Sequence, residues 1–325
     1  MKQGDCVKIK QWIQNIDFIN HAYTNYKWRE RKISCGQENK EKKFYVVRRA
    51  RAKVGLFSLV LTNLGYIKYA LEQGYIPVVD MSNYDMFYSG VDETTPNMWQ
   101  YYFEQPCGYS LQDINKSKNV ILGNGIISFD IPFPDDGIAY DDEKLAYWKA
   151  VAKEYLIVKD EIVRTVDSLI EEMFGKQRVL GVLARGTDYI NAKPLNHPVQ
   201  PMPEQIMEKI DEVMLEQKCD RIYLATEDKN FFKMFKDKYG DRIIAMDVER
   251  HETIGNQNIN EVRRMQKKSD YAMARDYLIN ILLLSKCNCL IAGNTSGSIG
   301  ALLLNDEYEY KYIFNLGVYR KNGEY

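Results

Sequence analysis

The stretch "VLGVLARGTDY", from Val179 to Tyr189, decides the fold of this chain. Its first six residues are almost all apolar, which favours a strand buried on both faces in a parallel sheet. One arginine, one glycine, one hydroxyl and one carboxylate follow at once, in Arg185–Asp188. Because ligands of parallel α/β sheets bind at the carboxyl ends of the strands, this stretch predicts a strand that presents a binding site.

Strands and helices alternate on both sides of this stretch. After it, the pattern predicts strands over 221–225, 242–246, 288–292 and 311–316, and helices over 203–217, 228–239, about 275–287 and 297–305. Before it, the pattern predicts strands over 43–49, 75–81 and 119–123, and a helix over 55–74. A helical run over about 143–174 joins the two series. The sequence therefore predicts an α/β protein with two Rossmann-like domains, 1–175 and 176–325, that face each other across a cleft.

The composition is that of a globular protein. The chain has 325 residues, is 45% hydrophobic and 27% charged, and has a net charge of -1, which gives no global attraction to nucleic acid. It contains neither an apolar run of the ~18 residues that a membrane helix needs nor a signal-peptide core, so we expect a cytoplasmic protein. Residues 27–53 carry 11 Lys/Arg and 3 Asp/Glu. That run is either a solvated basic face or a site for an anionic ligand or a membrane surface.

Cysteine and histidine usage predicts no bound metal. The six cysteines are scattered through a large chain, which favours free thiols over disulfides. Cys287 and Cys289 form C-x-C, but no second pair stands at the spacing of a zinc site, and the chain has only three histidines.

Three predicted loops follow strands of the second series and should lie on one edge of its sheet. Arginine pairs two phosphate oxygens at once, a Gly/Ser/Thr turn that opens a helix binds the same anion, and acidic residues suit ribose hydroxyls or a guanine edge. The candidate donor-binding residues on these loops are Arg185, Gly186, Thr226, Asp228, Asn294, Thr295, Ser296, Gly297 and Ser298. Each has a plainer alternative: an aspartate can cap a helix, the third loop can be an ordinary turn, and the arginine can be an ion-pair partner.

Four segments together resemble the α1,2-, α1,6- and protein-O-fucosyltransferases. "GVLARGTDY" resembles the arginine motif of that family, and "IYLATEDKNFF" and "LLLSKCNCLIAGNTSGSIGALLL" resemble its second and third motifs. "GLFSLVLTNLGYIKYALEQGYIPVVDM", which begins at Gly55, resembles the first loop and helix of its N-terminal domain. The resemblance covers roughly residues 43–316.

The resemblance implies a bacterial GT-B glycosyltransferase that is inverting, needs no metal or cofactor, and transfers fucose from GDP-fucose to a glycan hydroxyl in polysaccharide synthesis. Arg185 matches the arginine that holds the β-phosphate, Asp188 matches the aspartate of the motif, and Gly55 joins the donor-binding residues. Leu183 stands where the family usually has a histidine. We expect Arg185 and Asp188 to be catalytic, with Asp188 as the first candidate base, Asp130 as the second and His251 as a third.

We expect the predicted N-terminal domain to bind the glycan acceptor. The aromatic residues between Trp99 and Phe103 either stack on sugar faces or pack in the core. A nicotinamide oxidoreductase would show the same alternation, but the G-x-G-x-x-G fingerprint is missing. A non-catalytic nucleotide- or sugar-binding protein and a transferase for another nucleotide sugar remain as alternatives.

Overall fold

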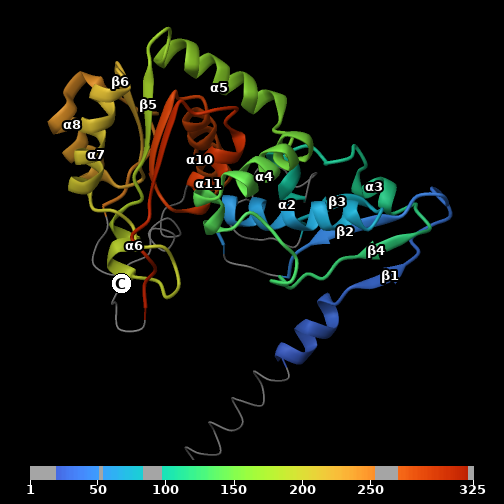
Figure 1. Ribbon diagram of the computed structural model, residues 1–325. Coiled ribbons are helices and arrows are strands. Elements are labelled where there is room, and N and C mark those ends of the chain that lie inside the picture. The colour runs from blue at the N-terminus through green and yellow to red at the C-terminus, as the bar shows by residue number, and fades with distance from the viewer. Residues whose placement is uncertain (1–19, 51–53, 83–96, 253–269, 321–325) are drawn as a thin grey trace, which may run out of the picture.

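The computed structural model describes residues 20–50, 54–82, 97–252 and 270–320, and it contains two separate sheets (Figure 1). The first sheet has the order β1-β4-β2-β3, with β1 (Arg31–Ile33), β2 (Phe44–Arg48), β3 (Ile76–Asp80) and β4 (Val120–Leu122). β2 runs parallel to both β3 and β4, and β1 pairs antiparallel with β4 at the edge. The sequence did not predict β1, because its short, charged stretch has no apolar alternation.

The second sheet is parallel throughout, with the order β7-β6-β5-β8-β9. Its strands are β5 (Val179–Leu183), β6 (Arg221–Ala225), β7 (Ile243–Ile244), β8 (Cys289–Gly293) and β9 (Tyr310–Phe314). Its main helices are α6 (Thr187–Ala192), α7 (Pro203–Glu216), α8 (Lys229–Tyr239), α10 (Asp270–Ser285) and α11 (Ser296–Leu304). The predicted alternation is confirmed, although β7 is shorter than expected.

The connection between the sheets differs from the predicted single helix. It consists of α4 (Asp142–Tyr155) and α5 (Asp160–Met173), preceded by the 3-10 helix η2 (Asp136–Tyr140). Between α4 and α5 the backbone leaves the helix to bond the chain beside Phe103: Glu104 N donates to Ile157 O at 2.8 Å, and Lys159 N donates to Tyr102 O at 3.0 Å. No glycine or proline marks this break, so tertiary hydrogen bonds decide it.

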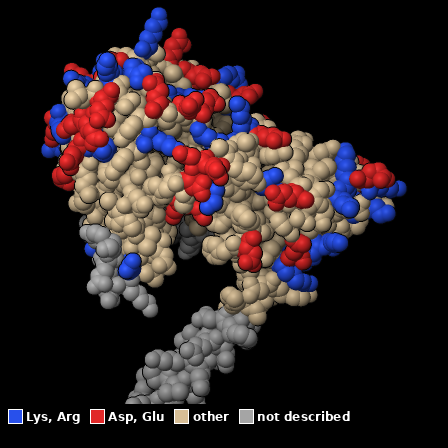
Figure 2. Space-filling view, in the orientation of Figure 1, with Lys and Arg blue, Asp and Glu red and all other residues tan. Residues whose placement is uncertain are grey.

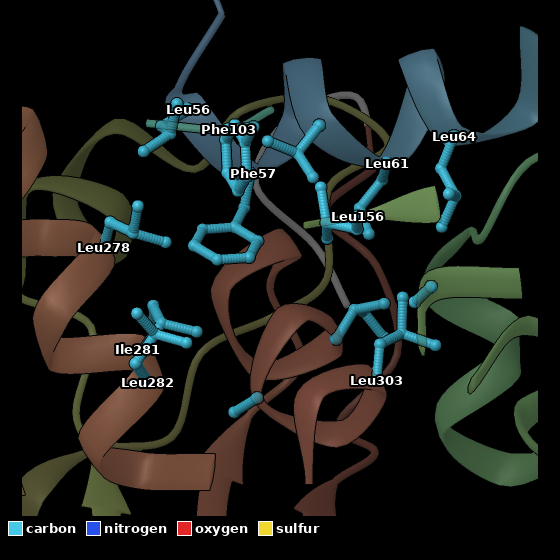
Figure 3. Packing of buried hydrophobic residues seen from close by; sticks show 14 of the residues in the cluster. Leu56, Phe57, Leu61, Leu64, Phe103, Leu156, Leu278, Ile281, Leu282 and Leu303 are labelled. Atoms are coloured by element: carbon cyan, nitrogen blue, oxygen red, sulfur yellow. The ribbon is translucent and has the colours of Figure 1, made fainter. Parts of the chain in front are cut away.

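One hydrophobic core joins the two halves of the molecule. The helix α2 (Leu56–Glu72) lies against α11, and its side chains meet those of α10 and α11 in the same cluster. Figure 3 shows Phe57 and Leu61 of α2 near Ile281 of α10 and Leu303 of α11. Because α4 also packs on α11 and α5 on α10, the division at residue 175 stays a prediction.

The remaining small elements complete the first half. They are the 3-10 helix η1 (Met98–Tyr101) and α3 (Leu111–Ile114), and η3 (Gly240–Arg242) lies in the second half. A smaller core of Phe44, Val46, Val78, Ile114 and Val120 fills the face of the first sheet opposite α2. In Figure 2 the surface is hollowed between the two halves on the lower side of the view.

The basic run of residues 27–53 is only partly a surface feature. Arg48 is buried, and it donates to Gly123 O at 2.7 Å and to Arg29 O at 3.0 Å. Arg49 is 2% exposed and lies over the ring of Tyr66. These two arginines therefore build the carboxyl end of β2, whereas residues 51–53 lie outside the described part of the chain. Within that part, no helix is both long and apolar enough to span a bilayer.

Candidate donor site

The three predicted loops lie on one rim of the second sheet. Leu183, at the end of β5, pairs with Ala225 of β6 on one side and with Ala292 of β8 on the other. The chain moves from β5 outward to β6 and β7, and then crosses to β8 on the opposite side of β5. The carboxyl ends of β5 and β8 therefore form the topological switch point at which such sheets bind ligands. We call the loops after β5, β6 and β8 the rim.

Arg185 leaves the end of β5 and meets an acid from the next strand. Its Nη1 lies 3.3 Å from Glu227 Oε1, and the two side chains are 23% and 21% exposed. The ion-pair alternative for this arginine is therefore present in the structure. Gly186 is buried, and a Cβ there would lie 2.9 Å from Asp228 Cβ, so only glycine lets the loop after β5 pack against the loop after β6.

In the loop after β6, the side chains of Thr226 and Asp228 form hydrogen bonds with nearby backbone N–H groups. Asp228 is fully buried and caps α8 by accepting from Asn230 N at 2.8 Å and from Phe231 N at 3.0 Å. Thr226 Oγ1 accepts from Asp228 N at 3.2 Å. Asp228 therefore caps α8, its donor-binding role stays a prediction, and Glu227 is the acid of this loop that contacts Arg185.

The loop after β8 opens α11 with a reciprocal cap. Ser298 N donates to Thr295 Oγ1 at 3.1 Å, and Thr295 N donates to Ser298 Oγ at 2.9 Å. Ser296 and Gly297 form the first turn of α11 between them. The positive end of the helix dipole therefore points into the switch point, where it favours an anion such as a phosphate.

Gln200 and Asp136, which the sequence reasoning missed, contact the predicted residue Asn294 at this end of the rim. Asn294 Nδ2 donates to Asp136 O at 3.0 Å, and Gln200 Nε2 donates to Asn294 O at 2.9 Å. Asn294 Oδ1 and Gln200 Oε1 are buried and accept no hydrogen bond from the described residues. A bound ligand with N–H or O–H groups would satisfy them. In the sequence, Gln200 stands shortly before Pro203, which begins α7, and this position near a helix start was the local hint of a site.

Asp136, in the connecting segment, contacts the rim through its backbone carbonyl, and its exposed side chain lies near the charge of His197. Partial desolvation raises the pKa of Asp136 above the usual 3.8, the positive charge of His197 partly offsets this rise, and Asp135 adds to it. His197 belongs to the loop between α6 and α7, and its carbonyl accepts from Tyr319 N at 3.0 Å. The carboxyl of Asp136 and the imidazole of His197 therefore come from opposite halves of the molecule and influence each other at the rim.

The remaining predicted site residues are Gly55, Asp130, His251 and Asp188. Gly55 is exposed at the start of α2, where an added Cβ would have no atom within 4 Å, and Asp130 is exposed and bonded to Ser128. His251 is 5% exposed, and its N donates to Glu227 O at 2.9 Å, so it braces the loop after β6 rather than sitting in solvent. The side chain of Asp188, on α6, lies outside the described residues.

The aromatic stretch is mainly core. Trp99, Tyr102 and Phe103 are at most 1% exposed, which confirms the packing alternative for them. Tyr101 instead lines an open hollow of about 330 Å³ together with Tyr271 and charged side chains of α5. This hollow does not include any residue of the rim.

A parallel sheet with an arginine and a helix N-terminus at its switch point, packed against a second α/β half, is the arrangement of a GT-B-type fold. Residues 137–297 match the family described as α-(1,6)-fucosyltransferase N- and catalytic domains. This part of the chain is therefore similar to the catalytic region of a fucosyltransferase. The matched range includes every predicted donor-binding residue except Gly55 and Ser298.

Solved structures similar to this chain are also fucosyltransferases. The fucosyltransferase NodZ from Bradyrhizobium is 16% identical, with 85% of this chain and 95% of that chain covered and a TM-score of 0.49. Arabidopsis thaliana FUT1, in complex with GDP, is 11% identical, with coverages of 86% and 72% and a TM-score of 0.48. POFUT1, in complex with GDP, is 12% identical, with coverages of 85% and 99% and a TM-score of 0.47. A search of curated proteins gives no match.

Proposed function

We propose that this protein transfers fucose from GDP-fucose to a glycan hydroxyl, with inversion and without a metal ion, in polysaccharide synthesis. The donor binds to residues 176–325 at the rim, and residues 1–175 bind the acceptor. The observation that carries the proposal is that Arg185 follows β5 and the N-terminus of α11 follows β8, at the carboxyl ends of two neighbouring strands. Two cationic or dipolar groups at this point suit a departing diphosphate.

In an inverting transfer, the acceptor hydroxyl attacks the anomeric carbon while the nucleotide leaves from the opposite face. Arg185 and the N–H groups at the start of α11 stabilise the charge that develops on the leaving phosphate. A carboxylate must take the proton of the acceptor hydroxyl. Asp188 and Asp130 remain candidates for this role, and Asp136 joins them because its backbone contacts Asn294 of the rim and the pKa of its side chain is raised.

The test is a transfer assay with purified protein, a panel of GDP-, UDP- and CMP-sugars, and fucosylated product detected by mass spectrometry. We expect turnover with GDP-fucose alone, at an unchanged rate in excess EDTA. Turnover that EDTA abolishes and Mn²⁺ restores would show that a metal holds the diphosphate. Turnover with another nucleotide sugar would keep the fold assignment but change the donor.

A further inference from the structure

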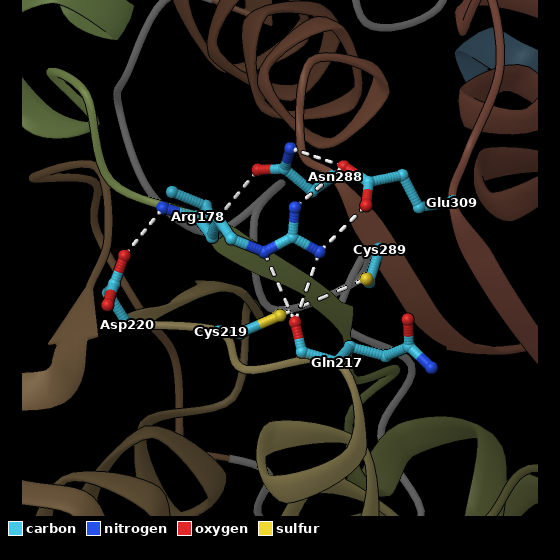
Figure 4. Close-up of polar contacts among 8 residues, drawn as sticks. Arg178, Gln217, Cys219, Asp220, Asn288, Cys289 and Glu309 are labelled. Atoms are coloured by element: carbon cyan, nitrogen blue, oxygen red, sulfur yellow. Dashed lines mark hydrogen bonds and ion pairs between the residues drawn. The ribbon is translucent and has the colours of Figure 1, made fainter.

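Two cysteine side chains meet at the end of the second sheet opposite the rim. Cys219 lies in the turn before β6, and Cys289 is the first residue of β8. Their Sγ atoms are 3.8 Å apart, and the side chains are 8% and 0% exposed (Figure 4). Both belong to the core between the second sheet and the helices α7 and α8. Thus two thiols that are 70 residues apart in sequence already touch in the folded protein.

A polar cluster fixes the two backbone segments that carry these thiols. The guanidinium of Arg178 donates to Gln217 O at 3.1 and 3.2 Å and binds both carboxylate oxygens of Glu309, at 2.7 and 3.1 Å. Arg178 N donates to Asp220 Oδ2 at 2.8 Å. Asn288, which precedes Cys289, donates to Glu309 at 3.0 Å. Figure 4 shows these contacts surrounding the thiol pair, so its geometry is held from both sides.

The two sulfur atoms differ in their electrostatic environment. The pKa of Cys219 is lowered, chiefly by the contact with Cys289 and also by the positive charge of Arg178. Burial and the carboxylates of Glu309 and Asp220 partly oppose this shift. The contact with Cys219 and burial raise the pKa of Cys289. Cys219 is 8% exposed and Cys289 is fully buried, so an oxidant from solvent reaches Cys219 first, which makes Cys219 the attacking and Cys289 the resolving cysteine.

We propose that Cys219 and Cys289 form a redox modification site, which a hydroperoxide-class oxidant converts into an intramolecular disulfide. The thiolate of Cys219 attacks one peroxide oxygen, the O–O bond breaks, and a sulfenic acid and hydroxide form. The thiol of Cys289 then attacks the sulfenic sulfur, the S–S bond forms and water leaves. The proton that Cys219 lost neutralises the hydroxide, so two thiols and one peroxide give one disulfide and two waters.

The disulfide would link the amino ends of β6 and β8, the two strands that flank β5. The sulfur atoms must approach from 3.8 Å to about 2.05 Å, a movement of the order of a side-chain adjustment. The link closes a long loop of the unfolded chain, which disfavours unfolding. Because the site lies at the opposite end of the strands from the rim, the proposal is independent of the donor and the acceptor.

The chain contains its own comparison thiols. Cys287 is two residues before Cys289 but projects into the other core of the second sheet, and its Sγ donates to Leu283 O at 3.5 Å. Burial raises the pKa of Cys287 well above its usual value. Cys35 is exposed and far apart in sequence from both. Cys287→Ser is the matched buried control, and Cys35→Ser removes a thiol that is exposed in the described part of the chain and could join two molecules.

The experiment treats the folded, full-length Cys35→Ser protein with hydrogen peroxide, blocks the remaining thiols with N-ethylmaleimide, and maps the non-reduced peptides by mass spectrometry. We expect a linked peptide pair that contains Cys219 and Cys289, a mass loss of two hydrogens that dithiothreitol reverses, and a higher melting temperature. Cys219→Ser and Cys289→Ser should each abolish the link, whereas Cys287→Ser should keep it. Alkylation or over-oxidation of both thiols without a link, or a link through any other cysteine, would overturn the proposal.

Discussion

At the scale of the residue, Arg185 has an ion pair in the structure and a proposed role in holding the leaving phosphate. It contacts Glu227 at 3.3 Å, and it stands at the switch point beside the N-terminus of α11. A partly exposed ion pair of this kind contributes little to stability. We therefore infer that Glu227 orients the guanidinium.

The first prediction concerns this arginine. Arg185→Lys keeps the charge but loses the planar fork, so we expect kcat to fall by about 10²–10³ while the melting temperature stays near that of the wild type. Steady-state kinetics and thermal melting on one preparation measure both quantities. Glu227→Gln is the matched control, because it breaks the same ion pair without touching the arginine. An early-melting Arg185→Lys protein whose folded fraction turns over normally would mean that the arginine is only structural.

The second prediction concerns the pH dependence of turnover. A general base works only when ionised, and the pKa of Asp136 is raised above 3.8, so the acid limb of the rate profile should lie above that value. His197 lowers the pKa of Asp136, so His197→Asn should move the acid limb to higher pH. Asp135, which raises the same pKa, is present in both proteins. Asp136→Asn should lose turnover at every pH. An acid limb that does not move in the His197→Asn protein would remove Asp136 as the base.

At the scale of the element, α11 links the two halves of the molecule. A Cβ at Gly300 would lie 2.2 and 2.3 Å from ring atoms of Phe57, so this glycine sets how closely α11 approaches α2. The backbone of α11 cannot move away without disturbing α10 and α4, which also pack on it. The short distance between the two helices is therefore built into the sequence of α11.

The third prediction follows from this contact. Gly300→Ala should lower the free energy of unfolding by about 1–3 kcal/mol, because overpacking outweighs the better helix propensity of alanine. Gly55→Ala is the control, since it adds the same methyl group at a position with φ of -67° and no atom within 4 Å. Urea denaturation of the two variants checks this result. Equal stabilities would show that α2 and α11 separate easily.

At the scale of the whole molecule, the two sheets share one core. The cluster that contains Leu59 and Leu64 of α2 also contains Leu278 and Leu302 of the second half. Separating the halves would expose this apolar surface to water, at roughly 25 cal/mol for each Å². The shared core therefore couples the stabilities of the two halves.

The fourth prediction is a single cooperative unfolding transition. In calorimetry we expect one peak, which GDP shifts upward because it binds only the folded state. At ~100 times its dissociation constant, a ligand adds about 2.7 kcal/mol. Two peaks, of which GDP moves only one, would show that the halves unfold independently.

The amino-acid sequence by itself determined the local elements and the place of the site. Apolar runs and glycines specified β5, β6, β8 and the helices between them, because a buried parallel strand has a near-continuous apolar composition. Since parallel strands end on the same edge, the three polar loops could be placed together from the sequence.

Only the tertiary structure decided which polar groups meet. The break between α4 and α5, the approach of Asp136 to Asn294, and the contact of Cys219 with Cys289 all join residues from distant parts of the chain. Local propensity carries no information about such contacts, because their free energy depends on how whole helices and strands pack. For the same reason, the sequence left two roles for Asp228, a donor-binding residue or a helix cap. The structure shows Asp228 buried at the start of α8, where it caps that helix.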